Sequence, residues 1–346
     1  QIFNKWKNLI IDHVDFSYNT SVTEHNFRAL ETQVNGITTL TGCTFTGTGF
    51  TDPSFSNENG FAICIRGGEV QIDGCKFING QQSDNKYIIY KEGNTSESLK
   101  ILNSQFTFDD TTASSGAVYV HNWNTVMIEN TIFKNCWTSD ETLAGAVTYG
   151  IGSGEKNNCV VKFDSCNFTN CDRDADSETG ARVIYTNFGR YSEWSNCLIE
   201  DSTNKNNGQG PLLYLGHADI TSTSFDSLTF QNNKASIGGG AGIIITGVKS
   251  RISFRDLTFI NNELAGESGG AISLEYNEPA PTTVSFTNCF FSNNKANGKP
   301  GGSISINSPT TTLKLDECVF DSLVEGAIPN LGGAIYVEKA ANVTLD

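Results

Sequence analysis

Four acidic residues in the segment Asp-Arg-Asp-Ala-Asp-Ser-Glu-Thr-Gly could hold a metal ion. Asp172, Asp174 and Asp176 alternate with other residues, as the first ligands of a calcium-binding loop do, and Glu178 follows them. The segment lacks the glycine that such loops carry at the sixth position, and Val183 stands at the twelfth position in place of a glutamate. A calcium site at the three aspartates is therefore one interpretation, and a solvated acidic loop is the other.

A second group of carboxylates could do hydrolytic chemistry. The adjacent pair Asp109-Asp110 supplies two carboxyl groups, which is what a polysaccharide hydrolase uses. No Arg or His accompanies the pair, and the four histidines of the chain stand in four different sequence contexts. The alternative is a solvated turn. We predict no catalytic residue and no cofactor other than calcium.

Eight of the ten cysteines fall at two positions of a repeating pattern. Cys136 and Cys171 share one position, and six share the other in successive pairs: Cys43, Cys75, Cys166, Cys197, Cys289 and Cys318. Stacked repeats would bring paired Cα atoms to about 4.8 Å, within disulfide range. Stacked side chains point the same way, so we expect buried thiols at the six positions. For Cys136 and Cys171 a disulfide and two thiols are both open. No C-x-x-C pair suggests zinc.

Sequons for N-glycosylation provide a further set of candidate sites. The pattern Asn-x-Ser/Thr occurs at Asn19, Asn94, Asn167 and Asn342. Asn19, Asn94 and Asn342 are the candidate glycosylation sites, and chance occurrence in a chain rich in Asn, Ser and Thr is the alternative.

The charge of the chain restricts its partners. Its 346 residues carry a net charge of −15, and the sequence pI is about 4.7. Nucleic acid and anionic membranes both attract clusters of Lys and Arg, so neither is an expected partner. The unbroken apolar runs are only a few residues long, as at Ile243-Ile244-Ile245, so no transmembrane segment is expected.

One repeated sequence motif predicts the elements that position these residues. In its full form, from Phe259 to Leu274, a Phe is followed by Asn, a polar loop, Gly-Gly-Ala and two aliphatic residues. The anchor residue recurs at intervals between 27 and 35 residues, at Phe16, Phe45, Phe77, Phe106, Phe133, Phe168, Ile199, Phe230, Phe259, Phe291 and Phe320. Self-similarity at a nearly fixed period is typical of solenoid proteins.

Each repeat predicts three short strands. An alternating apolar pair such as Val126 and Ile128 precedes the anchor, the anchor forms a second strand, and a segment such as Ala271-Ile272-Ser273-Leu274 forms the third. This pattern predicts an all-β, single-stranded, right-handed parallel β-helix with about 11 coils of roughly 30 residues. We expect one continuous β-helix over residues 1–346, without a second domain and with an irregular first coil over residues 1–36.

Two residue types in the repeated motif predict how the coils stack. Asn two residues after the anchor is expected to point inward and to form a hydrogen-bonded ladder, at Asn79, Asn135, Asn170, Asn232, Asn261 and Asn293. The Gly-Gly pairs 269–270, 301–302 and 332–333 are expected to allow positive φ and a close approach of neighbouring coils.

These motifs resemble a known repeat family. The series F-x-x-N or F-x-N-N followed by G-G-A and an aliphatic residue is similar to the repeats of the polymorphic membrane proteins, which are pectin-lyase-like parallel β-helices. The resemblance is sharpest between Phe230 and Val337, as in Phe259-Ile260-Asn261-Asn262 with Gly269-Gly270-Ala271-Ile272. It implies a β-helical protein that is exposed at a cell surface and acts in adhesion.

Three functions follow as hypotheses. The first is a non-enzymatic extracellular or cell-surface adhesin or scaffold that binds other proteins or glycans. It would use the loops of variable length, namely Gly47–Asn59, Gln81–Lys86, Trp137–Leu143 and Asp172–Thr179. The second is a filament or appendage component whose copies stack end to end, since residues 342–346 read as the opening strand of another coil of a longer chain. The third is a polysaccharide lyase or hydrolase.

Overall fold

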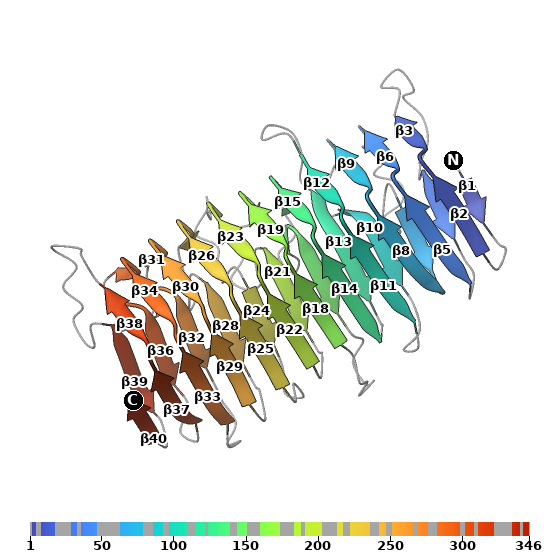
Figure 1. Cartoon of the computed structure of the whole chain (residues 1–346). Coiled ribbons are helices and arrows are strands. Elements are labelled where there is room, and N and C mark those ends of the chain that lie inside the picture. Colours follow the sequence, from blue (N-terminus) through green and yellow to red (C-terminus); the bar gives the residue numbers. More distant parts are fainter. Residues whose placement is uncertain are drawn as a thin grey trace.

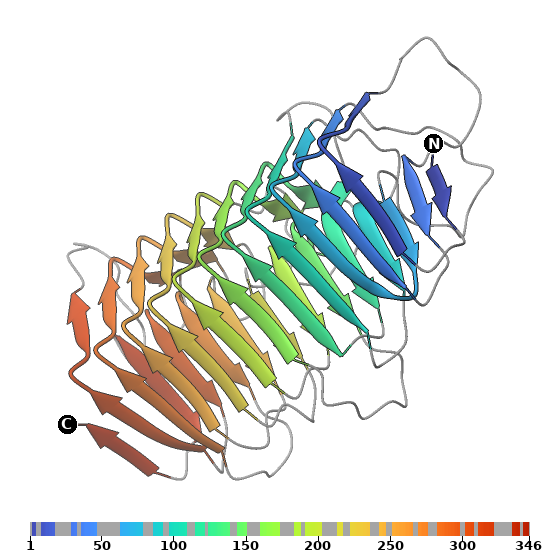
Figure 2. The same cartoon turned by 45° about the vertical axis from the view of Figure 1, so that its right-hand side comes forward.

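Three long parallel sheets run along a rod-shaped molecule, whose N- and C-termini lie at opposite ends (Figures 1 and 2). This computed structural model describes the following residues: 2–4, 8–17, 29–32, 36–46, 63–78, 86–92, 97–108, 115–121, 124–138, 144–150, 160–173, 183–187, 191–202, 213–216, 222–235, 242–246, 251–265, 269–275, 282–297, 302–307, 311–321, 334–339 and 342–345. No helix long and apolar enough to cross a membrane occurs in these ranges.

Sheet A begins each coil and contains 14 strands. Twelve of them follow one another along the rod: β1 (Ile2–Asn4), β4 (Leu30–Thr32), β7 (Ile63–Arg66), β10 (Lys86–Glu92), β13 (Ser115–His121), β17 (Val147–Gly150), β21 (Ile184–Asn187), β24 (Leu213–Gly216), β28 (Ile243–Thr246), β32 (Ile272–Glu275), β36 (Ile304–Asn307) and β39 (Ile335–Lys339). The other two are β16 (Trp137–Thr138), which pairs antiparallel with β13, and β20 (Asp172–Arg173), which pairs parallel with β16.

Sheet B follows sheet A in every coil and contains 12 strands. They are β2 (Asn8–Asp12), β5 (Ile37–Thr41), β8 (Glu69–Asp73), β11 (Ser98–Leu102), β14 (Thr125–Glu129), β18 (Val160–Asp164), β22 (Tyr191–Ser195), β25 (Ser222–Asp226), β29 (Arg251–Arg255), β33 (Thr282–Thr287), β37 (Thr311–Asp316) and β40 (Asn342–Leu345).

Sheet C carries the anchor residues and contains 11 strands. They are β3 (Asp15–Ser17), β6 (Thr44–Thr46), β9 (Lys76–Ile78), β12 (Gln105–Thr107), β15 (Ile132–Lys134), β19 (Asn167–Thr169), β23 (Leu198–Glu200), β26 (Thr229–Gln231), β30 (Thr258–Ile260), β34 (Phe290–Ser292) and β38 (Val319–Asp321). A further sheet of three short strands follows it, β27 (Lys234–Ala235), β31 (Glu263–Ala265) and β35 (Lys295–Asn297).

Each strand of sheets A, B and C pairs in parallel with its equivalents in the neighbouring coils, so the predicted parallel solenoid is confirmed. The irregular first coil expected over residues 1–36 stays a prediction, because residues 5–7, 18–28 and 33–35 lie outside the described residues. Its described strands β1, β2 and β3 pair in register with β4, β5 and β6. The reason is visible in Ile2, Leu9 and Phe16, which pack against the core as the equivalent residues of later coils do.

The anchor residues form two aromatic stacks inside the rod. From Phe16 to Phe168, and again from Phe230 to Phe320, neighbouring rings lie parallel, with centroids between 4.5 Å and 5.1 Å apart. Ile199 replaces the ring between the two stacks and pairs directly with Phe168 and Phe230. The spacing of parallel strands imposes this ring separation, so one buried Phe per coil fills the core.

The glycine pair 269–270 brings neighbouring coils close together, as predicted, whereas Gly301 and the pair 332–333 lie outside the described residues. Gly269 has a φ of +83°, and a Cβ on Gly270 would lie 2.7 Å from the carbonyl carbon and oxygen of Lys295 and against the carbonyl oxygen of Gly302. Backbone atoms cannot swing away, so we expect Gly270→Ala to lower the free energy of unfolding by about 3 kcal/mol in a urea titration.

The control for this substitution is Gly74→Ala. Its Cβ would find no atom closer than 3.8 Å, although its φ is +63°. It therefore carries only the cost of a positive φ, about 1 kcal/mol. Equal losses in the two variants would show that crowding at Gly270 is not what requires glycine.

Among the described residues, two buried threonine hydroxyls have no hydrogen-bond partner, those of Thr32 and Thr223. Thr223 points inward from β25 and is buried, and its Oγ1 makes no hydrogen bond. Removing a buried, unpaired hydroxyl while keeping the shape of the side chain should stabilise the folded state. We therefore expect Thr223→Val to raise the free energy of unfolding by about 1 kcal/mol. Buried Thr131 is the control, because its Oγ1 donates to the carbonyl oxygen of Glu129 at 2.9 Å. Thr131→Val should destabilise, and a gain in both variants would contradict the argument.

Candidate functional site

The connections between sheets differ in how freely their length varies. Each strand of sheet B from β2 to β37 is joined to the following strand of sheet C by two residues, from Asp12–Asp15 to Asp316–Val319. Connections from sheet A to sheet B range from two residues, after Arg66, to nine, after Gly150. Those from sheet C back to sheet A range from seven, after Ile78, to sixteen, after Thr46. Both edges of sheet A therefore carry the variable connections.

The two-residue turn between sheets B and C is built the same way in every coil. Its first residue has φ between +47° and +63°, which favours Gly, Asn and short polar residues, and includes Gly42, Asn103, Asn196 and Asn288. Its second residue points toward the core and is where the six paired cysteines stand. The turn thus reverses which residues face inward and fixes the distance between the sheets.

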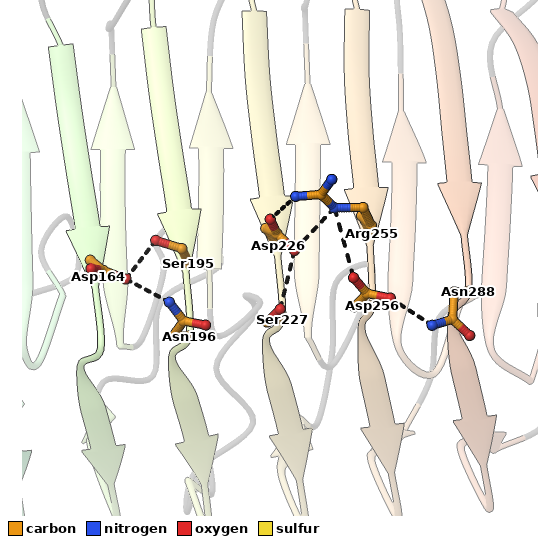
Figure 3. Close-up of polar contacts among 8 residues, drawn as sticks. All are labelled: Asp164, Ser195, Asn196, Asp226, Ser227, Arg255, Asp256 and Asn288. Carbon is orange, nitrogen blue, oxygen red and sulfur yellow. Dashed lines mark hydrogen bonds and ion pairs between the residues drawn. The ribbon is translucent and has the colours of Figure 1, made fainter.

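Polar side chains beside this turn bind one another from coil to coil. Asp164 accepts hydrogen bonds from Ser195 Oγ at 2.7 Å and Asn196 Nδ2 at 2.9 Å (Figure 3). Further along, Arg255 pairs with Asp226, and Asn288 Nδ2 donates to Asp256 at 2.6 Å. We call this set the carboxylate ridge: Asp164, Ser195, Asn196, Asp226, Ser227, Arg255, Asp256 and Asn288.

The electrostatics of the carboxylate ridge favour ionised carboxylates. The hydrogen bond from Ser195 lowers the pKa of Asp164, and the hydrogen bond from Arg255 lowers the pKa of Asp226. A glycosidase needs one carboxyl group whose pKa is raised, so that it can donate a proton near neutral pH. Asp164 and Asp226 have the opposite property. They hold neighbouring coils together instead of providing an acid.

The pairing across coils predicts a pH response at Asp226. We expect Arg255→Gln to raise the pKa of Asp226 toward its ordinary value of 3.8. Because the native pKa is lowered, the stabilisation is present above the unfolded pKa and is lost as the pH falls through the folded pKa. Side-chain ¹³C NMR titration of Asp226 between pH 2 and 6 measures this. An unchanged midpoint in the variant would show that Arg255 does not stabilise the carboxylate.

The inward asparagine ladder lies one residue later than the sequence predicts. Asn232 and Asn261, two residues after the anchors, have positive φ and are exposed, and Asn261 Nδ2 donates to Asn232 Oδ1 at 3.1 Å. The buried ladder is formed by Asn233, Asn262 and Asn294. At the described positions the prediction of inward Asn two residues after the anchor was wrong, because a residue with positive φ interrupts the alternation of the strand. Asn79 lies outside the described residues.

The buried ladder satisfies both backbone and side-chain groups. Asn262 Nδ2 donates to the carbonyl oxygen of Phe230 at 3.0 Å and to Asn294 Oδ1 at 2.9 Å. Asn262 Oδ1 accepts from the backbone N–H of Asn233 at 3.3 Å and from Asn233 Nδ2 at 3.0 Å. Asn262 therefore links its own coil to both neighbours.

Cys136 and Cys171 occupy this same ladder position in earlier coils. Both are free and buried, and Cys171 Sγ lies 3.4 Å from the carbonyl oxygen of Phe133, as Asn262 Nδ2 lies by Phe230. Burial raises the pKa of Cys136 well above its ordinary value. The disulfide considered from the sequence is not formed in this structure, where the two thiols each contact carbonyl oxygens.

The six cysteines at the other repeat position are also free thiols, five of them buried and Cys318 half-buried. Burial raises the pKa of Cys75 to about 12. A thiol with a raised pKa is a poor nucleophile, so buried Cys75 acts as a small core residue. Cys318 differs, because its hydrogen bond with Cys289 lowers its pKa to about 6.

A family model described as the right-handed β-helix region matches residues 138–342, which is more than half of the chain. The chain belongs to the right-handed β-helix family. The matched region contains six of the anchor positions, from Phe168 to Phe320. No curated protein matches this β-helix in sequence.

One solved structure resembles the β-helix in outline. It is the catalytic domain of a GH87 α-1,3-glucanase in complex with nigerose, with 12% sequence identity and a TM-score of 0.36. The alignment covers 95% of this chain and 63% of that domain, so this chain spans less than two thirds of its length.

The candidate metal and hydrolytic residues lie mostly outside the described part of the β-helix. Asp172 is in β20, whereas Asp174, Asp176 and the pair Asp109-Asp110 are outside the described residues. Where the structure describes the chain, no group of three His, Cys, Asp or Glu side chains is placed to hold a metal ion. The calcium site therefore stays a prediction.

The N-glycosylation sequons also lie partly outside the described residues. Asn19 and Asn94 lie outside the described residues, and Asn342 is exposed at the start of β40. Asn167 is half-buried in β19, where its Oδ1 accepts a hydrogen bond from Thr169 Oγ1 at 2.9 Å.

The outer face of sheet A holds residues that the sequence interpretation passed over. Where the third strand of the repeat reads Ala-Ile-x-Leu, tyrosines take the register position of x at Tyr90, Tyr119, Tyr185, Tyr214 and Tyr336. Tyr119 and Tyr336 are half-buried, whereas Cys64, Thr148 and Ser273 at the same position are buried. Two residues further on, Arg66, Glu92 and His121 align on consecutive strands. The signal was the residue between two aliphatic positions, which alternation assigns to the outside.

Proposed function

We propose that this β-helix is a non-enzymatic scaffold, outside the cell or at its surface, which binds protein or glycan partners along the side that carries sheet A. The observation that carries the proposal is the distribution of connection lengths. The turn between sheets B and C never varies, whereas both edges of sheet A carry connections of widely different length. Variable segments on a rigid frame are where proteins place recognition.

The remaining polar residues support this division of roles. The carboxylate ridge and the asparagine ladder are occupied by hydrogen bonds between coils, so they serve the frame. The loops expected from the sequence to bind partners all follow a strand of sheet C, and three of them also contain residues of sheet A strands, namely Lys86 in β10, Trp137–Thr138 in β16 and Asp172–Arg173 in β20. The resemblance of the repeats to those of the polymorphic membrane proteins adds the expectation of an adhesive, surface-exposed protein.

A loop replacement tests the proposal. The sixteen residues 47–62 are exchanged for residues 261–271, which make the same connection with the full repeated phrase. Binding of the wild-type chain and the variant is measured on an array of neutral and acidic oligosaccharides and on immobilised collagen, laminin and fibronectin. We expect the wild-type chain to bind at least one probe and the replacement to weaken that binding by about tenfold, or 1.4 kcal/mol.

Arg255→Gln is the control, because Arg255 ends strand β29 beside the turn between sheets B and C, at the edge of sheet B that lies away from sheet A. It should leave binding unchanged. Absence of binding to every probe, or loss of binding in Arg255→Gln alone, would contradict the proposal. Cleavage of a polysaccharide that is abolished by Asp109→Ala or Asp110→Ala would show an enzyme instead.

A further inference from the structure

Cys289 and Cys318 stand at the same place in two successive coils, as the second residue of the turn between sheets B and C. The strands that follow them, β34 and β38, pair in parallel, with Phe290 aligned with Val319 (Figure 1). The backbone N–H of Val319 donates to the carbonyl oxygen of Cys289 at 2.9 Å. The spacing of parallel strands holds the two cysteine Cα atoms about 4.8 Å apart, which a disulfide can span.

The two thiols contact each other. Cys289 Sγ lies 3.4 Å from the carbonyl oxygen of Thr287. Cys318 Sγ lies at the same distance from the carbonyl oxygen of Asp316, the equivalent residue of the next coil. A hydrogen bond joins the two sulfur atoms, in which Cys289 donates and Cys318 accepts. The pair is therefore already assembled for a reaction between its two sulfurs.

Exposure distinguishes this pair from the others at the same position. Of the nine cysteines in the described part of the chain, eight are buried and Cys318 is half-buried. The pairs Cys43–Cys75 and Cys166–Cys197 have the same backbone contact between coils, but both members of each pair are buried. A small oxidant in solution can therefore reach Cys318 more readily than it reaches those two pairs.

The charge state of Cys318 supports the same distinction. Its hydrogen bond with Cys289 lowers the pKa of Cys318 to about 6, although burial and the charge of Asp316 oppose this shift. The same hydrogen bond, together with burial, raises the pKa of Cys289, which keeps its proton. Because the thiolate is the reactive form of cysteine, Cys318 is the member of the pair that an oxidant modifies first at neutral pH.

We propose that Cys318 and Cys289 form an oxidation site, at which a hydroperoxide converts the two thiols into a disulfide between neighbouring coils. The Cys318 thiolate attacks one oxygen of hydrogen peroxide. An S–O bond forms, the O–O bond breaks, and the hydroxide that leaves takes up the proton that Cys318 lost on ionisation. Cys289 then attacks the sulfenic acid, so that an S–S bond forms, the S–O bond breaks, and a second water leaves with the Cys289 proton. The two sulfurs lose two electrons in total, which the peroxide gains.

The chain itself shows that serine is tolerated at this position. Ser104 is the second residue of the same turn in an earlier coil, where its hydroxyl donates to the carbonyl oxygen of Leu102 at 2.7 Å. This carbonyl oxygen is equivalent to those that the thiols of Cys289 and Cys318 contact. We therefore expect Cys289→Ser and Cys318→Ser to fold as the wild-type chain does, which their thermal midpoints check.

Peptide mapping of the full chain tests the site. The reduced chain is treated with hydrogen peroxide at pH 7, alkylated in denaturant and analysed by mass spectrometry without reduction. We expect a disulfide between the peptides that contain Cys289 and Cys318, formed at least about tenfold faster than one between Cys166 and Cys197. In Cys289→Ser the reaction should stop at the sulfenic acid of Cys318, which dimedone labels, and Cys318→Ser should form no disulfide at Cys289.

Cys166→Ser is the matched control, because it removes a buried thiol from the same position in another coil. It should leave the formation of the Cys289–Cys318 disulfide unchanged. Equal rates at the two pairs, or no reaction at Cys318, would overturn the proposal. A disulfide that joins Cys318 to a different cysteine would overturn it as well, and so would the absence of dimedone labelling in Cys289→Ser.

Discussion

Phe291→Ala should cost about 3–5 kcal/mol of the free energy of unfolding, because it removes a fully buried aromatic ring from the centre of the rod. Phe291 stacks on Phe259 at 5.1 Å and on Phe320 at 4.8 Å, so two ring contacts are lost with the side chain. Urea titration followed by circular dichroism measures the loss. Because each coil contacts mainly its neighbours, amide hydrogen exchange should speed up first in β30 and β38.

The same strand provides the matched control. Phe290 precedes Phe291 in β34 but is only half-buried and aligns with Thr258 and Val319 on the outside of sheet C. Phe290→Ala should change the free energy of unfolding by less than about 1 kcal/mol. Similar losses in the two variants would contradict the assignment of the anchor stack as the main source of stability.

Asn262→Ala should cost about 3–5 kcal/mol, since it leaves several buried polar groups without partners. The carbonyl oxygen of Phe230 and the backbone N–H of Asn233 both lose the bonds that Asn262 makes to them. The free energy of unfolding from urea titration measures the effect. Thermal unfolding of the same variant at several pH values should show a loss that does not depend on pH, because an amide does not titrate.

The chain itself suggests a milder substitution at this site. Ser202 occupies the equivalent ladder position, where its Oγ accepts from the backbone N–H of Cys171 at 3.1 Å. Asn262→Ser should therefore cost less than Asn262→Ala, because a hydroxyl can still accept from the N–H of Asn233. Asn261→Gly, which removes an exposed ladder side chain and keeps the positive φ, should cost less again. The reverse order would show that the buried ladder is not what holds these coils.

Much of the frame could be predicted from the sequence because its signals are local. The alternation around Phe133 and Phe168 and the repeated Gly-Gly-Ala each depend on residues a few positions apart. For Asn261 and Asn262 the local sequence pattern was not sufficient to predict which side chain is buried. Adjacent asparagines look equivalent in the sequence, and only the positive φ of Asn261 decides which of them faces inward.

The candidate sites were harder to predict because their members meet only when coils stack. Asp226 and Arg255 are 29 residues apart in the sequence, and only the register of β25 and β29 brings them together. Arg66, Glu92 and His121 likewise lie in three different coils. Repeat spacings that vary between coils do not fix which residues of successive coils align, so these groups needed the observed register.

Because the turn between sheets B and C has a constant length, one coil can take the place of another in the β-helix. Because two residues always join these sheets, a whole coil from one such turn to the next can be duplicated, removed or transplanted without changing how its neighbours meet. Insertions on the sheet A side change only what that coil presents to the outside. In a protein built this way, duplication of coils changes the length of the rod, whereas insertions beside sheet A change its surface, and the two kinds of mutation can occur independently.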